Sequence, residues 1–599
     1  MAYEKIKNNL PVLLLTAVLI FSASFMVKGA LGDSAIMDEL AHIPAGYSYV
    51  KFLDYRLNPE HPPLLKALSA LPLLGLNLNF DTDHKSWSKD INGQWEVGDR
   101  FLYLLGNDAD KIIFLSRLFP ILLTLITTIL IYIWSKELFG RWWSLLPTLF
   151  FGFSPTVLAH GHYVTTDIAA GFGVVLATYF FIKFLANPKK LNLVFSGVAL
   201  GVAELMKFSL VLLIPYFLII AVFFLISSLK KRNLFYYVKS IILIFLIALA
   251  VIYAVYFILT LNYPPEKQKT DTATILNSFS PWPLAETVIK ATENRLTRPL
   301  ADYFLGFFMV LQRSAGGNTG YFLGEVSTGG SRLYFPLVFL MKEPLPSLLF
   351  VLAAIIAAIA LFGKNLIVRK LNKTFFEKHF PEFGLLIFVA IYWAWSIKSP
   401  LNIGVRHLIP TFPFIYILGT VVIKNLKIPA KKFVIGGILL WLFLETAFAS
   451  PYFLSYFNEA AGGTNYGYRY VTDSNYDWGQ DLKRLKNWVD ARNNNNDHNN
   501  DVEKIAVDYF GGGNPRYYLG ERQENWGSAK GNPKDYGIEW LAVSVNTLES
   551  AFGKTASGFN RNQNDEYRWL SEIKNTPPGK GNVPEPDFKI GTSIFLYKL

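Results

Sequence analysis

The stretch IILIFLIALAVIYAVYFILTL, at residues 241–261, contains no charged side chain over 21 residues. An α-helix rises about 1.5 Å per residue, so a helix of this length would cross the roughly 30 Å hydrocarbon core of a bilayer. Apolar blocks of similar length recur along the chain. They predict a polytopic membrane protein built of α-helices, because a helix satisfies its own backbone hydrogen bonds in lipid.

Working outward from this stretch, we predict about eleven transmembrane helices. They cover residues 10–30, 112–134, 142–159, 167–186, 192–206, 208–228, 235–261, 336–362, 383–397, 408–423 and 432–450. The first follows MAYEKIKNNL, where a signal sequence would lie, but no clear small-residue cleavage site comes after it. We therefore interpret it as a retained first span.

Lys and Arg residues between the predicted spans indicate the orientation of the chain. They occur in every second segment, at 5–7, 136–141, 189–190, 230–232, 364–370 and 424–432. Short cytoplasmic loops retain basic residues, so these segments are predicted inside. Three long pieces then lie outside: 31–111, 262–335 and everything after about 451. We expect a multi-pass protein of the inner (plasma) membrane with an extracytoplasmic site.

The composition agrees with a membrane protein, since 52% of the residues are hydrophobic and only 17% are charged. The formal net charge is +12, but the basic residues lie in short runs between apolar blocks. This distribution indicates control of topology rather than binding of nucleic acid. The chain has no cysteine, which excludes disulfides, thiolate metal sites and a cysteine nucleophile.

The chain divides into two predicted parts. Residues 1–450 form a transmembrane catalytic domain with outer loops 31–111 and 262–335, and residues 451–599 form an extracytoplasmic soluble domain. Short strand-like runs predict an α/β or α+β fold for the second part. These runs are KIAVDYF (504–510), WLAVSVN (540–546) and TSIFLYKL (592–599).

Two further segments have a distinctive composition. HPPLLKALSALPLLGL, residues 61–76, is apolar but too short to span, so we predict an amphipathic helix along the membrane interface. RNNNNDHNND, residues 492–501, is a polar, low-complexity loop of the kind that stays disordered.

The first outer piece carries a dense polar cluster. Asp38 and Glu39 follow the first span, and Glu60 and His61 precede two prolines. Neighbouring carboxylates at a membrane surface can bind a divalent cation or leave one carboxylate as a general base. A single acid would more often cap a helix or face water. The density of this cluster favours a functional site.

A second polar group lies in SPTVLAHGHYVTTDIAAGF, residues 154–172, between the third and fourth predicted spans. It contains His162 and Asp167. Asp167 could cap the fourth helix, and a histidine in such a turn is more often solvated than a ligand. Both residues are nevertheless predicted at the same outer surface as Asp38.

Four basic residues come near span ends: Lys207, Lys342, Arg406 and His407. A charge within a span is costly without a partner, so we expect Lys342 to pair with Glu343 or to extend toward the interface. A guanidinium binds phosphate through two parallel hydrogen bonds. Arg406 is therefore predicted to hold the phosphate of a lipid.

An aromatic, Gly-rich run leads into the C-terminal part: SYFNEAAGGTNYGYRYVTDSNYDWGQDLKRL, residues 455–485. Aromatic faces together with amide and carboxylate groups suit carbohydrate binding. The same residue types also form ordinary turns and domain cores, so binding and packing remain equal alternatives.

The motifs resemble those of the bacterial protein O-mannosyltransferases, glycosyltransferase family 39, which have the GT-C fold. The resemblance rests on MDELAHIPAGYSYVKFLDYRLNPEHPPLLKALSALPL (37–73), SPTVLAHGHYVTTDIAAGF (154–172), YFPLVFLMKEPLP (334–346) and NIGVRHLIPTFPF (402–414). The acidic pair in the first outer loop is its most specific motif. The C-terminal part does not resemble the β-trefoil insert of the eukaryotic enzymes, so their protein acceptor is not carried over.

The resemblance implies an inverting transfer of mannose or a similar hexose from a polyprenyl-phosphate donor. It matches Asp38 to the catalytic aspartate, with Glu39 beside it, and matches Glu60, His61 and Asp167 to other family positions. With the residue chemistry above, the predicted catalytic residues are Asp38, Glu39 and Asp167. The predicted substrate-binding residues are Glu60, His61, His162, Lys207, Lys342, Arg406 and His407.

Cofactors and partners follow from this hypothesis. Whether Asp38, Glu60 and Asp167 bind a divalent cation (Mg²⁺, Mn²⁺ or Zn²⁺) is left open by the sequence. No nucleotide cofactor is expected. The expected partners are a polyprenyl-phosphate-linked sugar, a protein or glycan/lipid acceptor and membrane lipid, but no nucleic acid. Two alternatives remain: a transporter or flippase for lipid-linked glycans, and a non-catalytic envelope assembly protein. The matched, broken halves typical of transporters are not visible in the sequence.

Overall fold

The computed structural model describes residues 2–228, 233–278, 284–367, 372–494, 501–556, 558–576 and 582–599. Within these ranges, nine helices are long and apolar enough to cross a membrane. The apolar stretches are Asn9–Gly32, Ala109–Phe139, Thr166–Ala186, Phe208–Ser227, Leu234–Leu259, Leu345–Lys364, Phe380–Lys398, Val405–Asn425 and Lys431–Ala449. The prediction of a polytopic helical membrane protein is confirmed.

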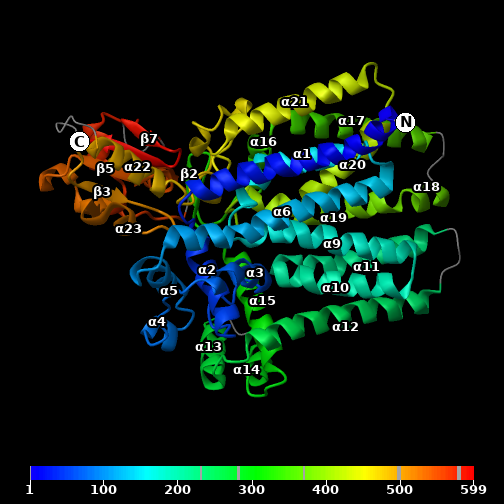
Figure 1. Ribbon diagram of the computed structural model, residues 1–599, viewed down its shortest axis with the longest axis horizontal. Coiled ribbons are helices and arrows are strands. Elements are labelled where there is room, and N and C mark those ends of the chain that lie inside the picture. The colour runs from blue at the N-terminus through cyan, green and yellow to red at the C-terminus, as the bar shows by residue number, and fades with distance from the viewer. Residues whose placement is uncertain are drawn as a thin grey trace.

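These spans form one bundle of roughly aligned helices (Figure 1). The helices are α1 (Ala2–Gly32), α6 (Ala109–Phe139), α9 (Thr166–Ala186), η3 (Phe208–Leu212) with α11 (Leu213–Ser227), α12 (Leu234–Leu259), α17 (Leu345–Ile367), α19 (Phe380–Lys398), η4 (Val405–Thr411) with α20 (Phe412–Asn425), and α21 (Lys431–Ala449). The largest cluster of buried apolar side chains lies between them and continues into the C-terminal region.

One of the eleven predicted spans, 142–159, is wrong as a continuous helix. Residues 142–159 form two short helices, α7 (Leu145–Gly152) and α8 (Pro155–His160), because Ser154 caps a new helix at its start. Residues 192–206 lie in α10 (Lys190–Met206), which packs between α9 and α12. The predicted helix over 192–206 is therefore present, and its 17 residues rise about 25 Å.

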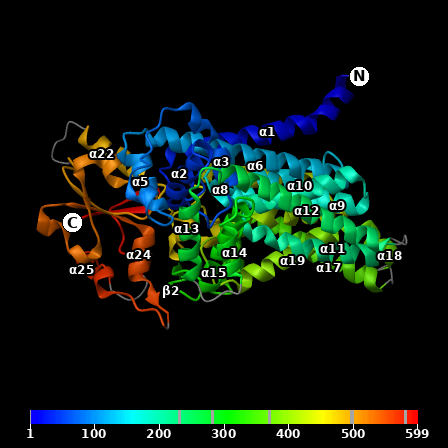
Figure 2. The same ribbon diagram turned by 90° about the horizontal axis from the view of Figure 1, so that it is seen from below.

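The three long pieces predicted outside lie at one end of the bundle (Figures 1 and 2). The first contains α2 (Met37–Lys51), α3 (Leu64–Ala70), α4 (Lys85–Ser88) and α5 (Gln94–Asp99). The second contains α13 (Pro265–Asn277), α14 (Ala285–Ala291) and α15 (Arg298–Gly316), followed by α16 (Tyr334–Lys342). The short helix α18 (Lys373–Lys378) lies at the opposite end (Figure 1).

The predicted helix over residues 61–76 is shorter and continues as a tight turn. It is α3, followed by a 3-10 turn at Leu71–Gly75. Leu65 and Leu73 are buried, whereas Leu71 and Leu74 are exposed. The segment is thus two-sided, as expected, with one face packed onto the protein.

A mixed five-stranded sheet forms the centre of the C-terminal region, in the order β4-β3-β5-β8-β7. The strands are β3 (Ile505–Asp508), β4 (Gln523–Asn525), β5 (Trp540–Ser544), β7 (Phe588–Ile590) and β8 (Ile594–Lys598). β3 pairs in parallel with β4 and β5, and β8 pairs antiparallel with β5 and β7. The helices are α22 (Leu482–Asn493), α23 (Pro515–Leu519), α24 (Val545–Phe552) and α25 (Arg568–Ile573). The three predicted strand runs supply β3, β5 and β8.

A small second sheet joins the second outer piece to this region. The hairpin strands β1 (Gly320–Phe322) and β2 (Glu325–Ser327) pair with β6 (Lys554–Thr555) in the order β1-β2-β6. The predicted polar loop over 492–501 lies mostly outside the described residues, as do the basic residues at 230–232 and 369–370.

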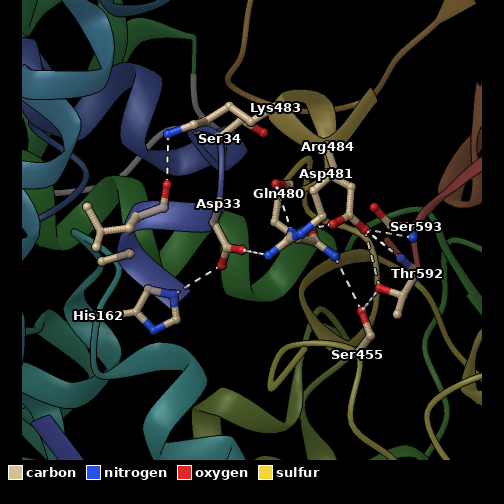
Figure 3. A network of polar contacts seen from close by, with 12 residues as sticks. Asp33, Ser34, His162, Ser455, Gln480, Asp481, Lys483, Arg484, Thr592 and Ser593 are labelled. Carbon is tan, nitrogen blue, oxygen red and sulfur yellow. Dashed lines mark hydrogen bonds and ion pairs between the residues drawn. The ribbon is translucent and has the colours of Figure 1, made fainter. Parts of the chain in front are cut away.

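A buried ion-pair network holds the C-terminal region against the bundle (Figure 3). Nη2 of Arg484, at the start of α22, lies 2.7 Å from Oδ1 of Asp33, which follows α1. The same guanidinium bonds Asp481, whose Oδ2 accepts hydrogen bonds of 2.8 Å from the backbone amides of Thr592 and Ser593. Arg484 thus connects the first span to the last strand.

Replacing Arg484 with Met should destabilise the protein strongly, because two buried carboxylates lose their counter-charge. Removing one partner of a buried pair costs about 3–5 kcal/mol. Burial raises the pKa of Asp33, but Arg484 and His162 outweigh it and hold this pKa below its ordinary value. A depressed carboxyl pKa stabilises the folded state above the unfolded pKa of about 4 and loses that contribution in acid. Thermal unfolding in detergent should therefore show a large deficit at pH 7 and a smaller one below pH 4.

The exposed pair Arg516–Glu521 in the same region supplies the control. Arg516→Met should leave the stability almost unchanged, because exposed ion pairs contribute little. Equal effects of the two substitutions would contradict the role given to Arg484.

Candidate functional site

A cavity of about 140 Å³ lies where several spans meet the first two outer pieces. Six of the ten predicted site residues line it, from five separate parts of the chain. Asp38 lies in the first turn of α2, and Asp167 in the first turn of α9. The others are His61, Lys207, Arg406 and His407. Acids from early segments and bases from later ones therefore meet at one place.

Arg406 joins the two aspartates at this cavity. Its Nη1 lies 3.1 Å from Oδ2 of Asp38 and 3.3 Å from Oδ2 of Asp167. Nζ of Lys207 lies 2.5 Å from Oδ1 of Asp167. The Asp38 side chain is 26% exposed, whereas that of Asp167 is 2% exposed. Asp38 can therefore reach an incoming substrate, while Asp167 positions the two cations.

Part of the cavity lining is apolar and aromatic. Phe208 and Leu212 begin the span of α11, Tyr392 and Trp395 come from α19, and Val310 comes from α15. Trp395 is exposed on a membrane-spanning helix. A cavity lined by both cationic and apolar side chains suits an amphipathic phosphate ester.

A second cavity adjoins the first on the side of the C-terminal region. Asp38, Arg313, Ile403 and Arg406 line both cavities. The second is also lined by the hairpin residues 318–321, by the segment 471–473 with Trp478, and by Asn546 of α24. Asp38 therefore lies on a wall shared by two cavities that are lined by different kinds of side chain.

Glu39, predicted as catalytic, does not line either cavity. Its carboxylate is buried and accepts two hydrogen bonds from Arg117, of 2.9 and 2.6 Å. The same oxygens accept backbone amides of Ile36 and Val164, each at 3.1 Å. A carboxylate with both oxygens bonded inside the protein positions the first outer piece and is not available to a substrate.

Two predicted substrate-binding residues also lie elsewhere. Nδ1 of His162 donates to the backbone oxygen of Leu158 at 2.8 Å, and its Nε2 faces Oδ2 of Asp33 at 3.2 Å (Figure 3). Nζ of Lys342 donates to two backbone oxygens, of Leu454 and Asn475, each at 2.6 Å. Both side chains fasten the bundle to neighbouring segments, so neither reaches the shared wall.

The two residues of the Glu60-His61 motif have different surroundings, and only His61 lines the first cavity. Glu60 accepts hydrogen bonds from the side-chain amides of Asn92 at 3.2 Å and Gln94 at 2.7 Å. His61 lines the first cavity and packs against the ring of His42 at 5.0 Å. Burial, together with the neighbouring His42, holds the pKa of His61 well below its ordinary value. His61 is therefore neutral at physiological pH and can donate or accept one hydrogen bond.

The predicted cation ligands do not form a set in this structure. Asp38 and Asp167 share the positive charge of Arg406, while amides occupy Glu60. Within the described ranges, no group of three His, Asp or Glu residues could hold a metal ion. As placed, these three residues do not fit a divalent cation.

Sequence reasoning missed two charged residues of the site. Arg313, in the last turn of α15, lines both cavities. Asp473 lines the second cavity, and burial raises its pKa to about 6. A basic residue ending the apolar run of the second outer piece was the available signal for Arg313. Asp473 stood in the aromatic run, where its spacing indicated no particular role.

One family model matches part of the membrane-spanning region. Residues 100–257 match the family model described as dolichyl-phosphate-mannose-protein mannosyltransferase. The predicted resemblance to this family is confirmed. No curated protein matches the chain.

Several solved structures are similar at low identity. The Saccharomyces cerevisiae O-mannosyltransferase Pmt1-Pmt2 complex, bound to its sugar donor, is 21% identical, with 42% of this chain and 33% of that chain covered and a TM-score of 0.31. ArnT from Cupriavidus metallidurans, bound to undecaprenyl phosphate, is 13% identical over 90% of this chain and 94% of that one, with a TM-score of 0.46. The oligosaccharyltransferase AglB from Archaeoglobus fulgidus is 12% identical over 90% and 70%, with a TM-score of 0.44. The aligned part thus spans a third of the yeast chain.

Proposed function

We propose that this protein is an inverting glycosyltransferase that moves a hexose, mannose or a similar sugar, from a polyprenyl-phosphate donor to an acceptor hydroxyl. The reaction takes place at the outer face of the plasma membrane. The observation that carries the proposal is the position of Asp38 on the wall between two cavities, with Arg406 beside it.

The first cavity has the chemistry that the donor requires. Lys207, Arg313 and Arg406 supply positive charge for a phosphate, and a planar guanidinium bonds two of its oxygens at once. Phe208, Leu212 and Trp395 supply apolar lining for the start of the polyprenyl chain, and Trp395 is exposed on the outside of its span. The sugar is then directed toward Asp38.

The transfer is a single displacement at the anomeric carbon. The carboxylate of Asp38 removes the proton of the acceptor hydroxyl, and the acceptor oxygen forms the new bond to carbon. The bond between the anomeric carbon and the phosphate oxygen breaks, and its electron pair leaves with the phosphate. Arg406 and Lys207 stabilise the charge that develops there. One displacement inverts the configuration.

Asp167 acts through the cations. It is buried and bonds both Lys207 and Arg406. It therefore fixes these two long side chains at the edge of the cavity. Such preorganisation lowers the reorganisation needed when the leaving phosphate becomes charged. Asp167 is therefore a positioning residue in this proposal.

A transfer assay tests the proposal directly. Purified protein in detergent is given a panel of polyprenyl-phosphate sugars with labelled hexoses, and envelope fractions serve as acceptor. We expect label on an acceptor identified by mass spectrometry, with the opposite anomeric configuration to the donor. Label that only crosses the membrane of a proteoliposome, with no new glycosidic bond, would instead identify a carrier.

A further inference from the structure

The second cavity differs from the first in its lining, which is polar and aromatic. Asn318, Thr319, Asn402, Asp473, Asn546 and Ser550 contribute hydroxyl, amide and carboxylate groups. Trp95, from α5, contributes an indole that is 43% exposed. Amide and carboxylate groups around an aromatic face are the groups that bind sugar hydroxyls and the apolar face of a sugar ring.

The segment that carries Asp473 is fixed to the donor side. Oγ of Ser474 donates to the backbone oxygen of Ile403. Nδ2 of Asn475 donates to the hydroxyl of Tyr334 at 2.8 Å, and its Oδ1 accepts the amide of Val405 at 2.9 Å. These hydrogen bonds fix the position of the second cavity relative to η4, the element that contains Arg406.

One side chain of the cavity, Asn546, is arranged for hydrogen bonding. Oδ1 of Asn546 accepts the backbone amide of Asp473 at 3.3 Å, and its backbone amide donates to Asp477 at 2.9 Å. These contacts fix the orientation of Asn546. Its side-chain nitrogen makes no hydrogen bond to any described residue. Trp478 stacks on Arg406, with 4.0 Å between the guanidinium carbon and the ring centre, and closes the shared wall.

We infer that this second cavity is the acceptor subsite and that its acceptor is a saccharide, held by Trp95, Asp473 and Asn546 with one hydroxyl directed at Asp38. The inference rests on the proposed function and deepens it. It assigns a role in substrate choice to the C-terminal region, because residues 471–478 and 546–550 supply much of the lining.

A peptide acceptor fits this cavity less well. An extended peptide commonly binds by adding to a free strand edge. One end of the β1 edge is already bonded, since Phe322 bridges Val471 and the amide of Leu323 donates to the oxygen of Tyr470 at 2.8 Å, which leaves only a short free edge. The aromatic rings and side-chain amides of the cavity remain available to bind an acceptor, and these groups favour a sugar.

Binding measured without donor tests the subsite. Saturation-transfer difference NMR on the purified full chain uses free hexoses and short hexose oligosaccharides as one set of probes, and a Ser/Thr-rich peptide as the other. We expect saccharide binding by the wild type. Trp95→Ala and Asn546→Ala should each weaken it about tenfold, as expected when one good contact worth about 1.4 kcal/mol is lost. Polyprenyl-phosphate binding should remain unchanged in both variants.

Trp142→Ala is the matched control, because Trp142 is equally exposed, at 44%, and does not line the cavity. This variant should bind saccharides as the wild type does. The inference is overturned if the wild type binds only the peptide, if it binds no saccharide, or if saccharide binding survives both cavity substitutions. Polyprenyl-phosphate binding by the wild type, measured on the same preparation, separately tests the proposed function.

Discussion

Replacing Asp38 with Asn should lower the catalytic constant for sugar transfer by about 10²- to 10⁴-fold, the usual contribution of a general base. The amide keeps the shape of the carboxylate but cannot take the acceptor proton. Because the proposed mechanism places the donor phosphate on Arg406 and Lys207, the KM for the polyprenyl-phosphate sugar should change little. Initial rates with the purified variant at varied donor concentration would separate the two constants.

Glu39→Gln provides the control one residue away. Glu39 bonds Arg117 inside the protein, so its loss should reduce stability by about 3–5 kcal/mol and leave the turnover of folded molecules intact. Normal turnover in Asp38→Asn, with an unchanged thermal midpoint, would remove Asp38 from the proposed chemistry. So would a larger loss of turnover in Glu39→Gln than in Asp38→Asn.

Different roles for these neighbouring acids follow from helix geometry, which the sequence pattern alone did not resolve. Both lie in the first turn of α2, and successive residues of a helix point about 100° apart. Only one can face the cavity. The partner of the other, Arg117, lies within a predicted span and carried no signal of the pairing. The acidic pair was thus correctly located by sequence, while the choice between its members needed coordinates.

The convergence of Asp38, Asp167 and Arg406 could be predicted because topology depends on hydropathy and basic loops. Both properties are local, so a single sequence contains them. Lys342 shows the limit of this reasoning. Its partners are backbone oxygens of Leu454 and Asn475, more than a hundred residues away, and a backbone oxygen has no residue type to recognise.

Helix boundaries show the same division. The apolar block over 336–362 was recognised, but the structure ends α16 at Lys342 and begins α17 at Leu345. Pro344 separates them, since a proline disfavours helical geometry in the residue before it. Hydropathy therefore predicted that the segment is apolar. The break between α16 and α17 depends on the backbone restriction imposed by Pro344, which a hydropathy average over many residues does not detect.

Arg406 lines both the proposed donor cavity and the proposed acceptor cavity. Arg406→Lys should reduce kcat/KM for the donor by about 10²- to 10³-fold, as for other groups that stabilise transition-state charge. Lysine keeps the positive charge but lacks the planar fork that reaches two carboxylates and a phosphate together. We expect a raised KM for the polyprenyl-phosphate sugar and a lowered catalytic constant, measured by initial rates and by direct donor binding.

Arg484→Lys is the closest control, because Arg484 also bridges two aspartates but lies outside both cavities. It should lower the thermal midpoint without changing the turnover of folded molecules. If charge alone mattered at position 406, lysine would restore nearly full activity and the two substitutions would look alike in the transfer assay. A large kinetic difference between two arginines in such similar pairs would instead assign the effect to phosphate contact, since of the two only Arg406 lines the first cavity.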